Sequence, residues 1–260
     1  MMPFSRTYPA AFLILLLTMF LGACASTPDE GADSRKWSVK KLYAEAKEAL
    51  DEGKYDKAIE HYETLESRFP FGFYAEQALL DVSYAYLKSG EPDTAIASAD
   101  RFIKLHPRHD SVDYAYYLRG LASSGKKEEL INIFLPKNAG SESQRDPSSS
   151  RKAYGYFSEL VKKFPHSKYV PDALKRMDRL RNTLAEHEIF VAKYYLQHSA
   201  YVAAVNRARY VIEHFPTTPS SHEALEILAQ GYTELGMEIL AQDARRVQEL
   251  NSSPANSHSK

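Results

Sequence analysis

Apolar and polar residues follow one another through most of this chain with the spacing of amphipathic helices. In one segment the apolar positions are Ala58, Ile59, Tyr62, Leu65 and Phe69, which stand one, three, three and four residues apart. Side chains with this spacing share one face of an α-helix, whereas side chains on one face of a strand are two residues apart. The sequence therefore predicts an all-α domain, which we place over residues 37–250.

A second regularity is a buried-type alanine followed twelve residues later by a proline. A glycine or serine precedes most of these alanines by five residues, as Gly53 precedes Ala58. We interpret the unit as a helical hairpin: a first helix, a turn, and a second helix that crosses the first at the small residue and ends before the proline. This pattern resembles the tetratricopeptide repeat. The alanine–proline pairs are Ala58 and Pro70, Ala95 and Pro107, Ala153 and Pro165, and Ala204 and Pro216.

Distances between the alanines predict where the repeat is interrupted. Ala58 to Ala95 is 37 residues, but Ala95 to Ala153 is 58, and the extra residues fall in a predicted long loop, 125–150. Ala153 to Ala204 is 51, and the 14 extra residues, about four helical turns, predict one long helix from Asp172 to about Leu196.

Five hairpins result, built around Ala58, Ala95, Ala153, Ala204 and Ala241. We expect repeats 1–3 over about 37–165 and repeats 4–5 over about 169–250, with a disordered tail at 251–260. Stacked hairpins of this kind form a right-handed superhelix with the first helix of each hairpin on the inner wall.

The N-terminal region reads as a targeting segment. Ala10–Leu21 is an apolar run of twelve, interrupted only by Thr18. A helix of that length is too short to cross about 30 Å of hydrocarbon, so we predict a signal peptide over residues 1–23. The run ends in Leu21-Gly22-Ala23-Cys24, which resembles the bacterial lipobox, and Cys24 is the only cysteine of the chain. An ordinary secretory peptide that happens to contain a cysteine is the alternative.

The lipobox resemblance implies N-acyl and S-diacylglycerol groups on Cys24 and a lipid-anchored chain. Residues 24–36 are small and polar, as in a flexible tether. Ala25, where inner-membrane lipoproteins usually carry aspartate, resembles an outer-membrane sorting signal. We therefore expect the domain to lie on the periplasmic face of the outer membrane.

Composition and missing motifs argue against several other functions. The 33 basic and 34 acidic residues balance, which is unlike a nucleic-acid-binding protein. Glycine-rich nucleotide-binding loops are missing, and neither His-Glu pair, at 187–188 or 222–223, continues as a zinc-protease motif. We expect no enzymatic activity, no metal and no cofactor other than the lipid.

Six strings go beyond the generic repeat and resemble the BamD (ComL-type) family of outer-membrane assembly lipoproteins over residues 24–250. The chain departs from the usual family pattern at Phe73, where proline is common, and at Tyr201, where tryptophan is common. The strings are Arg68-Phe69-Pro70-Phe71-Gly72, Asp100-Arg101-Phe102-Ile103, Tyr117-Leu118-Arg119-Gly120-Leu121, Arg145-Asp146-Pro147, Ala192-Lys193-Tyr194-Tyr195 and Val205-Asn206-Arg207.

This resemblance implies a lipoprotein that binds a BamA-type barrel protein and other assembly lipoproteins. Such a subunit helps to recognise unfolded outer-membrane proteins, through its first repeats, and to insert them into the membrane. Two alternatives remain: another periplasmic repeat lipoprotein that scaffolds cell-wall enzymes, or a hydrolase with an unrecognised site.

Helical phase predicts a substrate groove on the inner wall. An aromatic-walled groove suits an extended peptide that ends in an aromatic residue, and Arg119 is a candidate partner for the peptide's terminal carboxylate. The alternatives are that the tyrosines only pack one hairpin on the next and that Arg119 is solvated or pairs with a second helix. The residues predicted to face the groove are Tyr43, Leu80, Tyr84, Tyr114, Tyr117 and Leu121.

Basic residues in the fourth hairpin are candidates for partner binding. Lys175 and Arg179 stand four residues apart on the long helix, where like charges repel unless an acidic partner relieves them. The resemblance places the BamA contact at Asn206 and Arg207, and Arg209 adds a further charge. A merely solvated basic face is the alternative.

Overall fold

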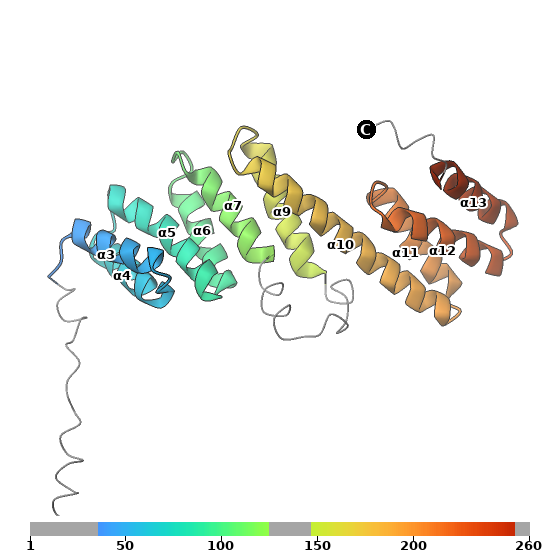
Figure 1. Cartoon of the computed structure of the whole chain (residues 1–260), viewed down its shortest axis with the longest axis horizontal. Coiled ribbons are helices and arrows are strands. Elements are labelled where there is room, and N and C mark those ends of the chain that lie inside the picture. The colour runs from blue at the N-terminus through green and yellow to red at the C-terminus, as the bar shows by residue number, and fades with distance from the viewer. Residues whose placement is uncertain (1–35, 125–146, 253–260) are drawn as a thin grey trace, which may run out of the picture.

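The computed structural model describes residues 36–124 and 147–252, which contain ten α-helices and no strand (Figure 1). The predicted all-α class and tetratricopeptide-type superhelix are confirmed. The helices are α3 (Val39–Asp51), α4 (Tyr55–Arg68), α5 (Phe73–Ser89), α6 (Pro92–Leu105), α7 (Val112–Ser124), α9 (Ser148–Lys163), α10 (Val170–Gln197), α11 (Tyr201–His214), α12 (Ser220–Glu234) and α13 (Glu238–Ser252).

Consecutive helices pair into five hairpins, which stand side by side in an elongated row (Figure 1). The pairs are α3–α4, α5–α6, α7–α9, α10–α11 and α12–α13. First helices also contact one another, α3 with α5, α5 with α7 and α10 with α12. We call this layer of first helices the inner wall.

The turns within the hairpins depend on left-handed backbone. Gly53, Gly90 and Gly236 have φ angles of 76°, 88° and 71°, and glycine adopts such angles without a steric penalty. The fourth hairpin has Ser199 at the same place, with φ 56°. A serine there carries a strain that the other turns avoid.

The alanines of the second helices mark where paired helices cross. All five are buried, with exposed fractions of 0 or 1%. An alanine side chain keeps the two helix axes close. The second helices of the first four hairpins end two residues before the predicted prolines, which are Pro70, Pro107, Pro165 and Pro216. In the third hairpin the partner position on α7 is Gly120, where an added Cβ would lie 2.3 Å from the ring of Phe157.

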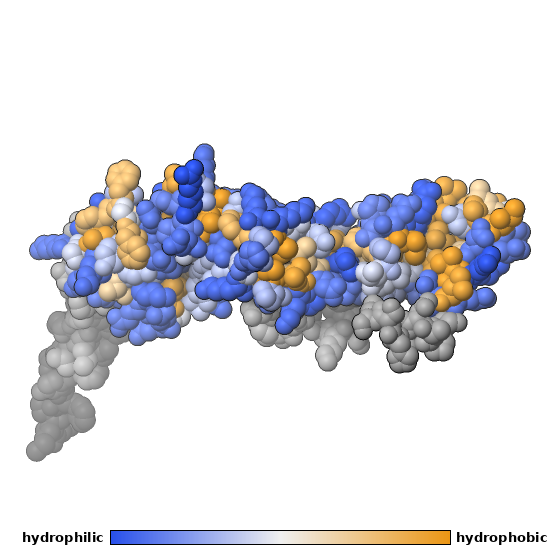
Figure 2. All heavy atoms as spheres, turned by 90° about the horizontal axis from the view of Figure 1, so that it is seen from above, coloured by the Kyte–Doolittle hydropathy of each residue, from blue (hydrophilic) through white to orange (hydrophobic). Residues whose placement is uncertain are grey.

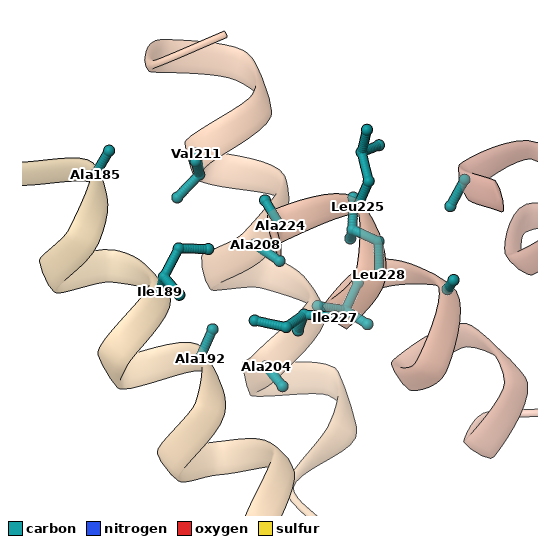
Figure 3. Packing of buried hydrophobic residues seen from close by; sticks show 13 residues of the cluster. Ala185, Ile189, Ala192, Ala204, Ala208, Val211, Ala224, Leu225, Ile227 and Leu228 are labelled. Atoms are coloured by element: carbon teal, nitrogen blue, oxygen red, sulfur yellow. The ribbon is translucent and has the colours of Figure 1, made fainter. Parts of the chain in front are cut away.

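The predicted long helix is confirmed as α10, which has 28 residues and carries Pro171 in its first turn. Its N-terminal half packs on α9 and its C-terminal half on α11 and α12. In Figure 3, Ala185, Ile189 and Ala192 project from α10 toward the small side chains of α11. A helix of about 42 Å therefore belongs to two cores and joins the third hairpin to the fourth.

Two predicted boundaries are wrong by a few residues. Ser148–Ser150, expected in a loop, begin α9, because Pro147 starts the helix and Ser123 of α7 donates to the carbonyl of Ser149 at 3.3 Å. The disordered tail was expected to begin at residue 251, but α13 runs to Ser252. The sequence has no helix-breaking residue before Pro254.

Other sequence predictions lie outside the described residues. These are the signal peptide, Cys24, the tether up to residue 35, residues 125–146 of the loop, and 253–260. In the two described stretches, no helix is both long enough and apolar enough to span a bilayer.

The close approach at Gly120 predicts an asymmetric response to alanine substitution. Gly120→Ala should destabilise the protein by about 1–3 kcal/mol, because the Phe157 ring beneath it must move. Gly155→Ala, with nothing within 4 Å of the new Cβ, should stabilise it by about 0.5–1 kcal/mol through helix propensity. Urea unfolding of the two variants measures both, and equal shifts would contradict the packing described for α7 and α9.

Candidate partner-binding surfaces

Two groups of tyrosines lie on or beside the inner wall, and each contains a tyrosine that donates a hydrogen bond to an aspartate of that wall. In the first group, Tyr43 of α3 donates to Asp81 Oδ2 at 2.9 Å and Tyr62 of α4 donates to the same oxygen at 3.4 Å. Gln77, one turn before Asp81 on α5, donates to Oδ1 at 3.1 Å. We call these four residues the Asp81 cluster. Burial raises the pKa of the Asp81 carboxyl above its usual range, although the three hydrogen bonds oppose that shift.

The second group is a stack of three rings. Tyr169, just before α10, lies between Tyr114 and Tyr117 of α7, with ring centroids 5.2 and 4.8 Å away. Tyr117 donates to Asp172, which also forms an ion pair with Arg176. Burial alone would raise the pKa of Asp172, but the hydrogen bonds from Tyr117 and Arg176 outweigh it and hold the pKa below its usual value.

The structure thus brings the predicted tyrosines together, in part through packing. Tyr84, Tyr114 and Tyr117 border one core cluster and Tyr43 borders the next, all partly exposed. Leu80 does not line an open groove, because it is 2% exposed within the core beneath Tyr114 and Tyr117. The tyrosines therefore do pack one hairpin on the next, which was the alternative that the sequence offered. The exposed parts of the same rings also belong to the inner wall.

A hollow of about 670 Å³ opens beside the Asp81 cluster. Tyr43 and Tyr74, whose ring centroids are 5.4 Å apart, form its aromatic side. Lys40 reaches the hollow from the first turn of α3 and forms no ion pair with any described residue. We call this feature the N-terminal hollow; its remaining lining residues are Ala44, Lys47, Glu48, Asp51 and Glu52.

Arg119 does not face the tyrosines predicted to line the groove. Its guanidinium lies 2.9 Å from Asp100 of α6 and 3.4 Å from Glu159 of α9, and 4.1 Å from the centre of the Tyr156 ring. The side chain is 12% exposed and points toward the second helices. The placement of Arg119 in the peptide groove is therefore wrong, and the alternative of pairing with a second helix is correct.

Arg207 belongs to a charge cluster around the buried Glu188, at the centre of the fourth hairpin. Glu188 of α10 is 3% exposed, and its carboxylate lies 2.9 Å from Arg207 of α11 and 3.7 Å from Arg151 of α9. The Arg207 side chain remains 47% exposed. Asn206 and Arg209 are exposed beside it, and Arg209 reaches Glu213 at 3.5 Å.

Lys175 and Arg179 form a separate patch. Both are exposed, and no carboxylate of a described residue lies within 4 Å of either one. Thirteen residues of helix, about 20 Å, separate Lys175 from Glu188. The predicted partner-binding residues therefore occupy two regions of α10 and α11 and not one.

Apolar side chains are exposed at the C-terminal end of the row. Figure 2 shows them gathered over the last hairpin. A helical repeat usually ends in a helix with a polar outer face, so this end is suited to a further contact. The exposed residues are Met237, Ile239, Leu240, Val247 and Leu250, of which Ile239 is 77% exposed.

The sequence alone did not identify several residues that take part in these surfaces. Asp81, Tyr169 and Arg151 become significant only through contacts between hairpins. Glu188 had appeared only as part of an incomplete His-Glu motif. In the parts of the chain that the structure describes, no group of three or more potential ligands is placed to hold a metal ion.

Comparison with known proteins places the chain in a family. A model of the YfiO family, described as an outer membrane lipoprotein, matches residues 35–247. "Outer membrane protein assembly factor BamD" of Neisseria meningitidis serogroup A is 45% identical over 91% of this chain and 90% of its own length. The proteins of the same name from Xylella fastidiosa and Vibrio cholerae are 36% and 35% identical, over 96% and 92% of this chain and 83% and 96% of their own lengths.

Solved structures show more distant similarity. A crystal structure of MamA covers 79% of this chain, and 95% of that protein, at 17% identity and a TM-score of 0.38. The TPR2AB domain of yeast Sti1 covers 82%, and 78% of that protein, at 16% identity and a TM-score of 0.40. The family model, in contrast, spans the described helices almost from the first to the last. The chain belongs to the YfiO family of outer membrane lipoproteins.

Proposed function

We propose that this protein is a non-enzymatic subunit of the machinery that assembles β-barrel proteins in the outer membrane. The observation that carries the proposal is the 45% identity, across nine-tenths of both chains, to a protein named for outer-membrane protein assembly. A row of five hairpins with an inner wall of first helices and exposed apolar residues at one end is suited to binding several polypeptides at once.

The inner wall is the proposed site for an unfolded substrate. The N-terminal hollow offers the rings of Tyr43 and Tyr74 to an aromatic side chain, and aromatic pairs are favourable beyond the area they bury. Further along, Tyr84, Tyr114 and Tyr117 extend the aromatic wall. Because Arg119 is engaged elsewhere, Lys40 replaces it as the candidate partner of a C-terminal carboxylate.

The fourth and fifth hairpins are the proposed contact for a BamA-type barrel protein and for other assembly lipoproteins. Asn206, Arg207 and Arg209 present polar and cationic groups there, and the apolar residues of α13 adjoin the same end. Lys175 and Arg179, which have no acidic partner among the described residues, favour an acidic surface on the bound protein.

We further propose that Cys24 carries the lipid anchor and holds the domain at the periplasmic face of the outer membrane. The chain between Cys24 and the first described residue, Lys36, is short. At about 3.3–3.6 Å per residue, it keeps the first hairpin within about 40 Å of the lipid.

Capture of the tagged, lipidated protein from mildly solubilised envelopes tests the function directly. We expect a large β-barrel protein to be recovered in about equal amount, identified by mass spectrometry. Recovery of cell-wall hydrolases without such a barrel would instead support a scaffold for those enzymes.

Cys24→Ala should abolish lipidation and release the protein from the membrane into the periplasmic fraction. Several acyl chains are needed for stable anchoring, and the described helices offer no span to replace them. Fractionation followed by immunoblotting measures the change, with Ala25→Ser as the matched control. A membrane-bound Cys24→Ala protein of unchanged mobility would contradict the anchor.

Charge reversal at the fourth hairpin should weaken capture of the barrel protein, and the internal pair of Arg207 makes the choice of variant important. Arg207→Glu places a second carboxylate against buried Glu188, so weak capture by that variant mixes binding with folding. Arg209→Glu and Lys175→Glu leave Glu188 untouched and should reduce capture without lowering Tm. Normal capture by both would contradict the proposed surface.

The charge cluster around Glu188 predicts that alanine substitutions at Arg207 and Arg209 differ in their effect on stability. Arg207→Ala should lower the free energy of unfolding by about 1–3 kcal/mol, because Glu188 is buried and loses its nearer cation. Arg209→Ala removes a pair exposed on both sides and should change it by less than about 0.5 kcal/mol. Urea titration of the two variants compares them.

A further inference from the structure

The two tyrosine-bound aspartates of the inner wall differ in one respect. Asp172 accepts from Tyr117 and has its charge balanced by Arg176 on the next turn of α10. Asp81 accepts from Tyr43 and Tyr62, yet no lysine or arginine of the described residues lies within ion-pair distance of it. Lys47 is the cation whose charge acts on the Asp81 carboxylate, but its Nζ lies 3.1 Å from Oδ1 of Asp51 and pairs with that residue. Asp81 therefore presents a negative charge that the fold itself does not balance.

The Asp81 carboxylate also has room for a further donor. Two carboxylate oxygens offer about four acceptor positions, and Tyr43, Tyr62 and Gln77 occupy three. The residue is half-buried and not sealed in the core. A charged group held partly out of water without a counter-ion is costly, and a cation that reaches it gains a stronger interaction than at the open surface.

Tyrosine rings surround this position on both sides along the wall. Tyr43 lies on the α3 side, and Tyr84 follows Asp81 by one turn on α5. Tyr114 of α7 borders the same core cluster as Tyr84 of α5, and these two first helices contact each other. Tyrosine faces attract ammonium and guanidinium groups, so the rings reinforce the carboxylate.

We propose that Asp81, with Tyr43, Tyr84 and Tyr114, is a receptor for a lysine or arginine side chain of the unfolded polypeptide bound on the inner wall. This inference rests on the proposed function and adds to it a specificity. The Tyr43 ring borders both the N-terminal hollow and Asp81, so an aromatic residue in the hollow places the cation within a few residues of it along the substrate. The preferred segment is then cationic and aromatic together.

Fluorescence anisotropy with synthetic peptides and the full lipidated chain in detergent tests the inference. The probes are unstructured peptides ending in phenylalanine, with one lysine at one of the four preceding positions, and the same peptides with glutamine there. We expect at least one lysine peptide to bind about tenfold more tightly than its glutamine partner. Asp81→Asn should remove that difference while leaving the affinity for the glutamine peptide unchanged.

Glu60→Gln is the matched control, since it removes the same charge from the same hairpin at an exposed position of α4 that does not line the hollow. It should preserve the lysine preference; an equal loss in both variants would mean general charge attraction and would overturn the receptor. Binding of the two peptides with equal affinity would overturn it while leaving the groove intact. Binding of neither peptide would overturn the proposed groove as well.

The pH dependence of stability shows separately whether Asp81 is the uncompensated charge described here. The folded-state pKa of Asp81 is raised, so its ionisation costs stability as the pH rises from the unfolded-state pKa through the folded one. The facing groups from other helices are Tyr43, Lys47, Tyr62 and Tyr114. Burial raises the pKa of the three phenols above the ordinary value of a tyrosine, outside that window. The Tm of Asp81→Asn relative to the natural protein should rise as the pH is raised above the ordinary pKa of an aspartate, and a constant difference would contradict an uncompensated charge.

Discussion

The close crossing of paired helices at a buried small residue is the contact on which the rest of this structure depends. Each hairpin has an alanine of 0 or 1% exposure at the crossing, and the third hairpin adds Gly120 on the opposing helix. A larger side chain would move the two helices apart, and every later hairpin would change its angle to the wall. Since each hairpin contacts mainly its neighbours, small local distances set the curvature of the whole row.

The long helix α10 makes the row continuous after the third hairpin. A hairpin of ordinary length packs on the unit before it and the unit after it through separate surfaces. Here α10 packs on α9 with one half and on α11 and α12 with the other. Glu188 lies in the second half, and its pairs with Arg151 and Arg207 connect α9, α10 and α11. A partner that contacts Arg207 therefore contacts a residue that also joins neighbouring hairpins.

The two partly buried aspartates of the inner wall differ in whether a cation of the fold balances their charge. Arg176 balances Asp172, and that site is complete within the fold. Asp81 keeps a charge that accepts hydrogen bonds from two tyrosines and a glutamine but forms no ion pair with a described lysine or arginine. Stability alone would favour an uncharged residue at position 81, because burial penalises the ionised form. Retaining a carboxylate there is understandable if the wall receives a cation from outside.

Sequence periodicity alone determined the fold class, the five hairpins, the positions of the crossing alanines and the length of α10. These features are local, since helix spacing, turn residues and prolines act within one or two turns of the chain. Helical phase separates Tyr117 and Arg119, because two residues correspond to roughly 200° around a helix. It could not identify the partners that each one meets, because those partners come from different hairpins. It also could not separate Asp81 from Asp172, since the presence or absence of a balancing cation depends on packing. Tertiary structure decided those questions because a side chain's partners are set by how hairpins stack and not by its own neighbours in the chain.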